Sequence, residues 1–436
     1  MEIQRPYYLK RLIDKMHNGR VKIITGVRRC GKSYLLFHLF KAYLLEHGVE
    51  PSQIIEIALD KKQFETLRNP NLLYQYVLDH LNQSKQTYLF IDEIQLSYKV
   101  KNPAIDEKSV AEEDRDLIYT TFYDILNDLM ARSDLDIYVT GSNSKMLSKD
   151  VATNFRDRGS EIRLFPLRFS EYYPISGKEK ADAWEDYLVW GGMPLAILES
   201  DEKERSKYLS SLFERLYIAD IVERYGTTDA FVGNLIDVLS SAVGSLTNLT
   251  KLTNTLNTVC HAGTTDKTVK KYLDAFEDAF LFQKAQRYDI KGKSYFQSPY
   301  KYYATDLGLR NARLNFRQIE ESHLMENAIF NELICRDCSV DVGAVRFAET
   351  TQNGKIEQMH EIDFVVNQGG KKIYIQSAWN ISDPTKREQE LLPLKKSGDF
   401  FKKMVVLGGN QKAHLDEDGI TYIGVIPFLL DENCLD

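Results

Sequence analysis

One short segment constrains the fold of this chain more than any other, the glycine-bounded run Gly26-Val-Arg-Arg-Cys-Gly-Lys-Ser33. The five residues before it, 21–25, are apolar and rich in β-branched side chains, which favours a strand. The residues after it, 34–40, form a second apolar run that favours a helix. Strand, glycine loop and helix in this order predict an α/β fold in which backbone N–H groups converge on an anion at the start of the helix.

The residue types within this loop match the needs of a bound nucleotide. The pattern GxxxxGKS predicts that Lys32 reaches the β- and γ-phosphates and that Ser33 ligates Mg²⁺. The expected cofactors are therefore ATP and Mg²⁺. The guanidinium groups of Arg28 and Arg29 either add phosphate contacts, face a partner or are simply solvated. The predicted nucleotide-binding residues are Gly26, Val27, Arg28, Arg29, Cys30, Gly31, Lys32, Ser33 and Tyr34.

A second apolar run, residues 87–91, ends in the acidic pair Asp92-Glu93. A strand that delivers a carboxylate to the metal is the partner that a phosphate loop requires. We expect Asp92 to hold Mg²⁺ through water and Glu93 to polarise the attacking water as a general base. The alternative is a strand that ends at the surface in two solvated acids.

The next apolar run, beginning at Asp136, ends in the small polar residues Thr140, Ser142 and Asn143. The edge of a doubly wound sheet that holds the ligand is typically built this way. One of these side chains, with Asn143 as the choice for a catalytic role, is expected to contact the γ-phosphate. The other interpretation is turn and helix-capping chemistry, for which Ser and Asn are common.

Together these motifs resemble the AAA+ ATPase superfamily, and specifically a widespread prokaryotic group of ATPases with a C-terminal domain of unknown function. The resemblance covers almost the whole chain. In AAA+ proteins an arginine after the sensor strand can complete a neighbouring subunit's site, and Arg158 is the matching candidate here, although Asp157 replaces the usual preceding glycine. The matching segments are 25–33, 90–95, 140–144 and 165–172, with 191–194 and 288–293 beyond the ATPase core.

The middle of the chain has the pattern of a winged helix-turn-helix. Two short helical segments, the second at 264–276, precede strand-like runs at 280–282 and 301–304. Residues 245–313 carry eleven Lys and Arg against six Asp and Glu, a local charge of +5. This favours phosphate contacts to duplex DNA, with protein docking as the alternative. The candidate contacts are Lys267, Lys270 and Lys271 on the second helix and Lys291 and Lys293 on the wing.

The C-terminal region resembles a PD-(D/E)XK nuclease-like fold. A helix carrying Glu326 is followed by a strand carrying Asp363, as in active members, in which acids hold a divalent metal that activates water. The third strand has Gln376 and Ala378 where glutamate and lysine are expected. A neutral amide is a weak ligand for a hard cation, so the sequence predicts a degenerate and inactive site.

Length and charge limit the remaining possibilities. A chain of 436 residues predicts about three domains, and we divide it into an ATPase domain (1–175), a helical lid or connector (176–240), a mainly helical winged-helix-like domain (241–318) and an α/β nuclease-like domain (319–436). The net charge of −7 excludes a protein whose whole surface is basic and binds nucleic acid. No run is long enough to span a membrane and no signal peptide is recognisable, so a cytoplasmic location is expected. The five cysteines, including the pair Cys335 and Cys338, are expected to be reduced.

The sequence thus predicts an ATPase that acts as a nucleotide-dependent switch or motor, with DNA or a protein as its partner and oligomers as an option. Two alternatives stay open. The first is an ATP-gated, metal-dependent nuclease that uses Glu326, Asp363 and Gln376. The second is a scaffold that ATP orders without being hydrolysed.

Overall fold

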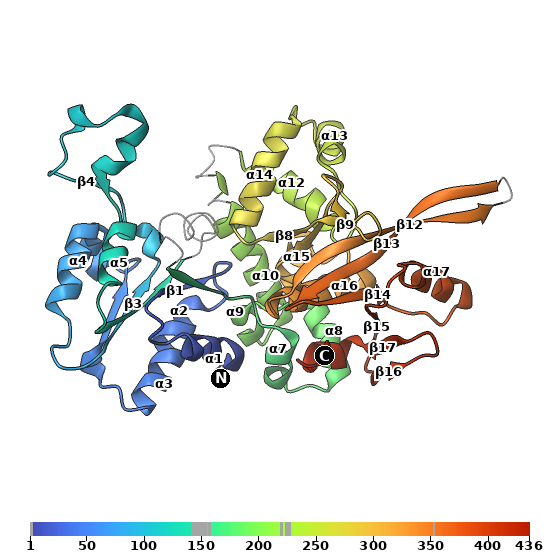
Figure 1. Cartoon of the computed structure of the whole chain (residues 1–436), viewed down its shortest axis with the longest axis horizontal. Coiled ribbons are helices and arrows are strands. Elements are labelled where there is room, and N and C mark those ends of the chain that lie inside the picture. The colour runs from blue at the N-terminus through green and yellow to red at the C-terminus, as the bar shows by residue number, and fades with distance from the viewer. Residues whose placement is uncertain (1–2, 142–154, 156–157, 219–220, 223–227, 352–353) are drawn as a thin grey trace. The chain divides into compact units, whose positions relative to one another are not determined.

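The computed structural model describes residues 3–141, 155, 158–218, 221–222, 228–351 and 354–436. It contains two compact units (Figure 1). Residues 1–165 with 278–280 form the first, and residues 166–277 with 281–436 form the second. The break falls at Phe165, earlier than the expected boundary at 175, and the finer divisions at 240 and 318 stay predictions. No helix among the described residues is long and apolar enough to cross a membrane.

A five-stranded parallel sheet in the order β2-β3-β6-β1-β7 is the centre of the first unit. Every residue of β1, β3 and β6 is buried, which explains why these strands are mostly apolar rather than alternating. The buried Lys22 of β1 and Asp136 of β6 form an ion pair with each other. Because β6 lies between β1 and β3, the carboxyl ends of these three strands meet at one edge of the sheet. The strands are β1 (Val21–Thr25), β2 (Ile54–Ala58), β3 (Thr87–Asp92), β6 (Leu135–Thr140) and β7 (Gly159–Arg163).

The helical segment after the glycine loop is fixed on this sheet by aromatic packing. It runs without interruption through α2 (Lys32–Tyr34), the π-helical η1 (Leu35–Phe40) and α3 (Lys41–Glu46). The ring of Phe40 lies 5.7 Å from that of Phe90 on β3 and 4.8 Å from that of Tyr138 on β6. The middle of this helical segment is therefore packed on β3 and β6. The other helices of this unit are α1 (Pro6–Asp14), η2 (Pro51–Gln53), η3 (Lys62–Arg68), α4 (Pro70–Asp79), η4 (Ile94–Leu96) and α5 (Phe122–Leu129).

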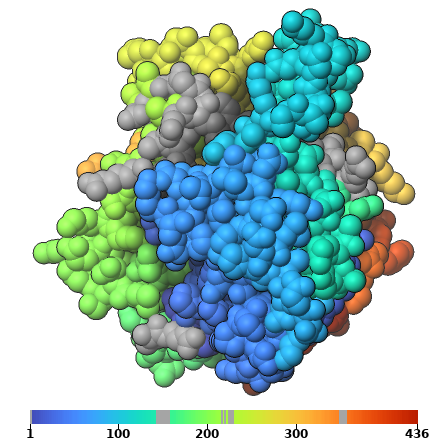
Figure 2. All heavy atoms as spheres, turned by 90° about the vertical axis from the view of Figure 1, so that its left-hand side faces the viewer, coloured from blue at the N-terminus to red at the C-terminus, as the bar shows by residue number. Residues whose placement is uncertain are grey.

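A polar segment projects from the first unit between β3 and α5. Its base is a short antiparallel pair, β4 (Val100–Lys101) with β5 (Tyr119–Thr120). Between these strands lie the 3₁₀ turns η5 (Glu107–Ser109) and η6 (Glu112–Ile118). The projection is the cyan lobe that extends beyond α4 and α5 in Figures 1 and 2.

The second unit begins with helices and a two-stranded sheet. In the latter, β8 (Phe282–Ala285) pairs antiparallel with β11 (Lys301–Ala304), and Thr247 makes a single bridge to Tyr300. The predicted helix at 264–276 is confirmed as α14, with Val269, Leu273 and Phe276 buried. The helices are α7 (Phe169–Ser176), α8 (Lys180–Trp190), α9 (Pro194–Leu198), α10 (Glu202–Leu212), η8 (Phe213–Ile218), α12 (Asp229–Ser241), α13 (Leu249–Val259), α14 (Asp266–Asp278) and α15 (Leu307–Arg313).

The Gly191-Gly192 pair has a packing role in this unit. A Cβ on Gly191 would overlap the backbone of Gly308 and the carboxylate of Asp306, and one on Gly192 would overlap the carbonyl oxygen of Leu167. The Asp306 carboxylate accepts hydrogen bonds from the Gly192 N–H (2.7 Å) and from the Leu309 N–H (2.8 Å), and so caps α15. Only glycine allows this approach of two backbones.

An eight-stranded mixed sheet in the order β10-β9-β12-β13-β14-β15-β17-β16 completes the second unit. The turn that carries the predicted wing belongs to it, because β9 pairs in parallel with β12. The middle region and the nuclease-like region therefore share one sheet. In Figure 1 the β12–β13 hairpin extends beyond the other strands. The elements are β9 (Arg287–Asp289), β10 (Ser294–Tyr295), α16 (Glu321–Cys335), β12 (Ser339–Thr351), β13 (Gly354–Gln368), β14 (Lys371–Ala378), α17 (Pro384–Lys395), β15 (Lys402–Leu407), β16 (His414–Leu415), β17 (Ile420–Gly424) and α18 (Val425–Leu430).

Candidate nucleotide-binding site

The glycine loop closes around the ammonium group of Lys32. This side chain is only 4% exposed, and its Nζ donates to the carbonyl oxygens of Gly26 (3.1 Å) and Val27 (3.2 Å). The ammonium is thus held inside the loop by weak neutral acceptors. A phosphate oxygen is a stronger acceptor for a charged donor, so the geometry suits an exchange of these carbonyls for a phosphate.

Two glycines are required by the shape of the loop. Gly26 has φ of 139°, and a Cβ there would overlap the carbonyl oxygen of Leu164. Gly31 has φ of 102° and immediately precedes α2. Arg29 takes the same left-handed region with φ of 65°, which is uncommon for a residue with a side chain. The loop is therefore a concave backbone turn, as phosphate binding requires.

Arg5, which the sequence motifs did not identify, braces the loop from the side. Its guanidinium is 3% exposed and donates to the Cys30 carbonyl oxygen (3.1 Å) and to the Phe165 carbonyl oxygen (2.8 Å). The same group lies 4.7 Å from the ring centre of Tyr8. Arg5 therefore ties the glycine loop to the segment that follows β7. No local pattern marks it, because its partners are backbone atoms distant in sequence.

The acid at the end of β3 lies beside the predicted metal ligand. The Ser33 hydroxyl donates to Asp92 Oδ1 at 3.0 Å, and the Thr140 hydroxyl donates to the same oxygen. Burial raises the pKa of Asp92 above the usual range for a carboxyl, while the hydrogen bonds from Thr140 and Ser33 oppose that rise. A hydroxyl and a carboxylate side by side are the hard oxygen donors that Mg²⁺ prefers, so these residues fit the metal that the motif implies.

Glu93 follows in a strained backbone conformation. Its φ is 52°, in the left-handed region, and its N–H donates to Thr140 Oγ1 at 3.1 Å. The carboxylate of Glu93 accepts a hydrogen bond from the Gln95 amide. Thr140 thus joins both acids, since its hydroxyl donates to Asp92 and accepts from Glu93. Thr140 thus positions the Asp92 carboxylate and the Glu93 backbone, and its contact with the γ-phosphate stays a prediction.

Of the two remaining catalytic candidates, only Arg158 is among the described residues. Asn143 lies outside the described residues, as does Ser142. Arg158 is exposed and precedes β7, whose residue Gly159 pairs with Val21 at the start of β1. The glycine loop follows the other end of β1. Within one chain, Arg158 is therefore at the opposite edge of the sheet.

The predicted DNA contacts lie on exposed surface of the second unit. Lys267, Lys270 and Lys271 are all exposed on α14, and Lys291 and Lys293 are exposed in the turn between β9 and β10. Thr265 Oγ1 accepts from the Thr268 N–H (3.3 Å), which fixes the start of α14. The buried residues of α14 include Val269, Leu273 and Phe276, so its three lysines lie outside the apolar core.

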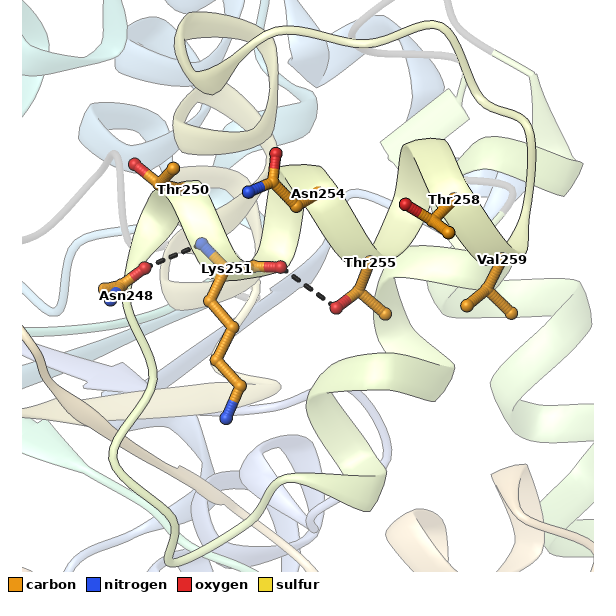
Figure 3. Close-up of a pocket in the computed structure, with 7 residues that line it drawn as sticks. All are labelled: Asn248, Thr250, Lys251, Asn254, Thr255, Thr258 and Val259. Atoms are coloured by element: carbon orange, nitrogen blue, oxygen red, sulfur yellow. Dashed lines mark hydrogen bonds between the residues drawn. The ribbon is translucent and has the colours of Figure 1, made fainter.

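The helix before α14 presents a polar groove. Its volume is about 560 Å³, and it is lined by one charged residue, Lys251, among small polar side chains and Val259 (Figure 3). The other lining residues are Asn248, Thr250, Asn254, Thr255 and Thr258. Val259 is 71% exposed. This groove is distinct from the nucleotide site, which lies in the first unit.

The nuclease-like residues do come together, but around a lysine. Glu326, Asp363 and Gln376 are each less than 9% exposed. The ammonium of Lys301 lies 2.8 Å from Glu326 Oε1 and 3.2 Å from Asp363 Oδ1. In the sequence, Lys301 is one of the eleven basic residues of segment 245–313. Nothing in the local run Lys301-Tyr-Tyr-Ala signals this role.

The cysteines form no disulfide, as expected for reduced thiols. All five are free, and Cys335 and Cys338 are buried. Over the residues that the structure describes, no three His, Cys, Asp or Glu side chains are grouped so as to hold a metal ion. The Cys335/Cys338 pair is therefore packed as part of the apolar interior.

Comparison with known proteins identifies both parts of the chain. Residues 18–173 match the AAA domain, and residues 181–320 match a domain of unknown function. An uncharacterized protein of Methanocaldococcus jannaschii is 27% identical over 401 residues, covering 88% of this chain and 80% of that protein.

Among solved structures, a Walker-type ATPase of Pyrococcus abyssi is similar with a TM-score of 0.45 and 13% identity, covering 72% of this chain and 96% of that one. The Orc1 protein of Aeropyrum pernix, solved in complex with DNA, has a TM-score of 0.27 and 12% identity, with coverage of 72% and 93%. Likenesses this distant carry no argument about activity.

An uncharacterized protein of Haemophilus influenzae is 30% identical over 435 residues. The match covers 98% of this chain and 98% of that protein. The protein belongs to the same family as this Haemophilus influenzae protein, and its residues 18–173 are an AAA domain.

Proposed function

We propose that this protein binds Mg-ATP in its first unit and hydrolyses it, acting as a nucleotide-dependent switch. The observation that carries the proposal is the meeting of Ser33 and Asp92, 3.0 Å apart, beside a loop that already holds an ammonium. Lys32 and Ser33 come from the start of a helix and Asp92 from the end of β3, and the sheet order brings them to a single edge. Hydroxyl, carboxylate and ammonium at one place match the oxygen donors for a metal and the cation for a phosphate.

Each residue has a distinct part in this proposal. Lys32 exchanges its carbonyl partners for phosphate oxygens, and Ser33 and Asp92 hold Mg²⁺, which neutralises charge on the phosphates when bound. Glu93 accepts a proton from the attacking water through its carboxylate. The amide of Gln95, which hydrogen-bonds to that carboxylate, orients it. The Thr140 hydroxyl keeps Asp92 and Glu93 at a fixed spacing.

Phosphate release by the purified protein tests this proposal. We expect Mg-dependent turnover that is lost in Lys32→Ala through loss of nucleotide binding. Glu93→Gln is expected to keep ATP binding but to lose turnover by about 10²-fold or more, as for removal of a general base. ATP binding without turnover in the wild-type protein would favour the scaffold alternative, and absence of ATP binding would refute the proposal.

A second function, duplex DNA binding by the middle region, is favoured by the exposed lysines of α14. Lys267, Lys270 and Lys271 lie within two helical turns of one another on a helix whose opposite face is buried. The polar groove of α13 adds Lys251 and hydrogen-bonding side chains nearby in the chain. Cations on one helix face are the groups that contact DNA phosphates.

Salt-dependent DNA binding distinguishes this function from protein docking. We expect the triple variant Lys267→Ala/Lys270→Ala/Lys271→Ala to reduce the slope of log K against log salt by about 3, because each phosphate contact contributes roughly 0.9. The matched control removes the exposed Lys203 and Lys207 of α10 and should leave the slope unchanged. Equal slopes in all three proteins would assign the α14 lysines to another role.

A further inference from the structure

Three carboxylates of the nuclease-like region share one internal cation. Glu326 and Asp363 are buried, whereas the Glu361 side chain is 29% exposed. Lys301 Nζ lies 2.8 Å from Glu326 Oε1, 2.6 Å from Glu361 Oε1 and 3.2 Å from Asp363 Oδ1. An ammonium has three N–H donors and no acceptor, so three carboxylates use its full capacity. Lys301 itself is 2% exposed.

The cation and the acids come from different parts of the second unit. Glu326 lies on α16 and the other two acids lie on β13, two residues apart and so on the same face of that strand. Lys301 comes from β11 of the small two-stranded sheet. Two residues along β11, the Tyr303 hydroxyl donates to Glu326 Oε1 at 2.7 Å, so this strand supplies two donors to the acids.

The surroundings of the cluster are closed by backbone. A Cβ on Gly244 would lie 3.3 Å from both carboxylate oxygens of Glu326, which is tighter than most real contacts. The N–H of Ser377 donates to Asp363 Oδ2 at 2.9 Å, which occupies the oxygen that does not face Lys301. Glu326 and Asp363 are therefore enclosed, and their oxygens accept hydrogen bonds from groups of the chain itself.

We propose that Lys301 is the resident cation of this carboxylate site and excludes divalent metal from it. Oxygens 2.6–3.2 Å from an ammonium surround a position that a metal would also need, since Ca²⁺ takes oxygen ligands at about 2.3–2.6 Å. The two cations cannot occupy that position together. The nuclease-like site then has a structural role, because its ion pairs hold β11 against α16 and β13.

The acids around Lys301 keep its side chain in the ammonium form. Burial by itself would lower the pKa of Lys301, but Glu326 and its neighbours raise it well above the usual range, so the ammonium stays charged. Burial raises the pKa of Glu326 to about 7, with Lys301 opposing that rise. The three acids carry more negative charge than one ammonium balances. Removal of the ammonium would therefore have a large electrostatic cost.

The presence of Gln376 where active nucleases have a glutamate has a physical reason in this arrangement. Its amide Nε2 donates to Glu390 Oε2 at 2.8 Å, and its Oε1 lies 3.4 Å from the Asp363 N–H. A glutamate there would place a further carboxylate against Glu390 and Asp363, with only one ammonium to balance them all. A neutral amide instead donates to one acid, and so suits a site that holds a single positive charge.

The experiment compares Ca²⁺ binding in the full chain with and without the lysine. We expect Lys301→Ala to melt at a lower temperature than wild type, to recover on addition of Ca²⁺, and to bind Ca²⁺ at least tenfold more tightly than wild type by calorimetry. Because the nucleotide site is unchanged, any Ca²⁺ bound there is common to both proteins and cancels in the comparison. The control Lys301→Ala/Asp363→Asn should lose the recovery.

A second pair of measurements keeps the proposal refutable. If Lys301→Ala does not fold, Lys301→Ala/Glu326→Gln removes one negative charge with the ammonium and retains two acids, and it too should bind Ca²⁺ more tightly than wild type. Folded variants with no gain in Ca²⁺ binding would overturn the proposal. So would wild-type protein that binds Ca²⁺ as tightly as the variant, or that nicks duplex DNA with Mn²⁺ and loses this activity in Lys301→Ala, since Lys301 would then serve a metal site rather than replace the metal.

Discussion

Replacement of Thr140 by valine removes one hydroxyl that connects both acids of the candidate nucleotide site. Thr140 is fully buried at the end of β6, donates to Asp92 Oδ1 and accepts from the Glu93 N–H at 3.1 Å. Valine has nearly the same shape, so the change deletes hydrogen bonds without opening a cavity. Serine keeps the hydroxyl and is the matched control.

The size of the effect follows from these two contacts. A buried N–H left without an acceptor costs about 1–3 kcal/mol, and a hydrogen bond to a charged group contributes roughly 1.5–3 kcal/mol. Ser33 still donates to Asp92, which offsets part of the second loss. We therefore expect Thr140→Val to destabilise the first unit by about 2–4 kcal/mol. For a unit of this size, that lowers its melting temperature by roughly 5–15 °C.

The pH dependence of turnover gives a second and sharper readout. The Thr140 hydrogen bond lowers the pKa of Asp92 against the rise caused by burial, so its loss moves that pKa further upward. Metal binding needs the ionised carboxylate, so the acid limb of the ATPase profile is expected to move to higher pH in Thr140→Val. The stability penalty should likewise be larger above the pKa of Asp92 than below it, because the charged form has lost a donor.

The assays are urea and thermal unfolding at two pH values and phosphate release across the pH range. Thr140→Ser should stay within about 1 kcal/mol of wild type, since it retains both hydrogen bonds. A valine variant with unchanged stability and an unchanged acid limb would refute the positioning role of this hydroxyl. A valine variant that loses turnover at every pH with no change in stability would indicate direct contact with the nucleotide instead.

Three further predictions follow from buried groups. Arg5→Ala removes a charge-assisted hydrogen bond to Cys30 of the glycine loop and another to Phe165. It should weaken ATP binding by about tenfold or more, with Arg5→Lys in between, as measured by nucleotide titration. Burial raises the pKa of Asp306 from 3.8 to about 6. The contribution of its protonated form to stability is therefore complete below about pH 4 and is lost as the pH rises through about 6. Over that range, urea unfolding should show the stability of wild type relative to Asp306→Asn falling by up to ~3 kcal/mol. Burial also raises the pKa of the Cys30 thiol, so iodoacetamide should modify the half-exposed Cys260 well before Cys30 in the folded protein, as read by mass spectrometry.

The interaction between the two regions of the second unit bears on the choice among functions. Because β9 pairs with β12 and Lys301 joins β11 to α16 and β13, the middle region is part of one packed body with the C-terminal sheet. A nuclease gated by withdrawal of Lys301 would have to break its ion pairs with Glu326, Glu361 and Asp363. The arrangement therefore favours the switch over the ATP-gated nuclease.

The elements that the sequence predicted well are those whose determinants are neighbours in the chain. The apolar run at 21–25 became β1 with the same bounds, and the run ending at Asp92 became β3. The helical segment predicted at 264–276 is α14, with Val269, Leu273 and Phe276 buried. The glycine loop is also local, since its strand, its glycines and its helix are consecutive. For such features, backbone preference and hydrophobic period are sufficient.

The contacts that the sequence did not reveal join residues far apart in the chain. Arg5 and Phe165 are separated by 160 positions, and Lys301 and Asp363 by 62. In both cases the partner is chosen by strand order and by the need to pair a buried charge, which has no local signature. The sequence by itself thus determined a phosphate loop, its acids and an α/β sheet, because these depend on residues close in sequence. Only the tertiary structure decided that Thr140 joins both acids, that Arg5 braces the loop and that a lysine stands among the nuclease-like carboxylates, because buried polar groups take whichever partner the fold brings within hydrogen-bond distance.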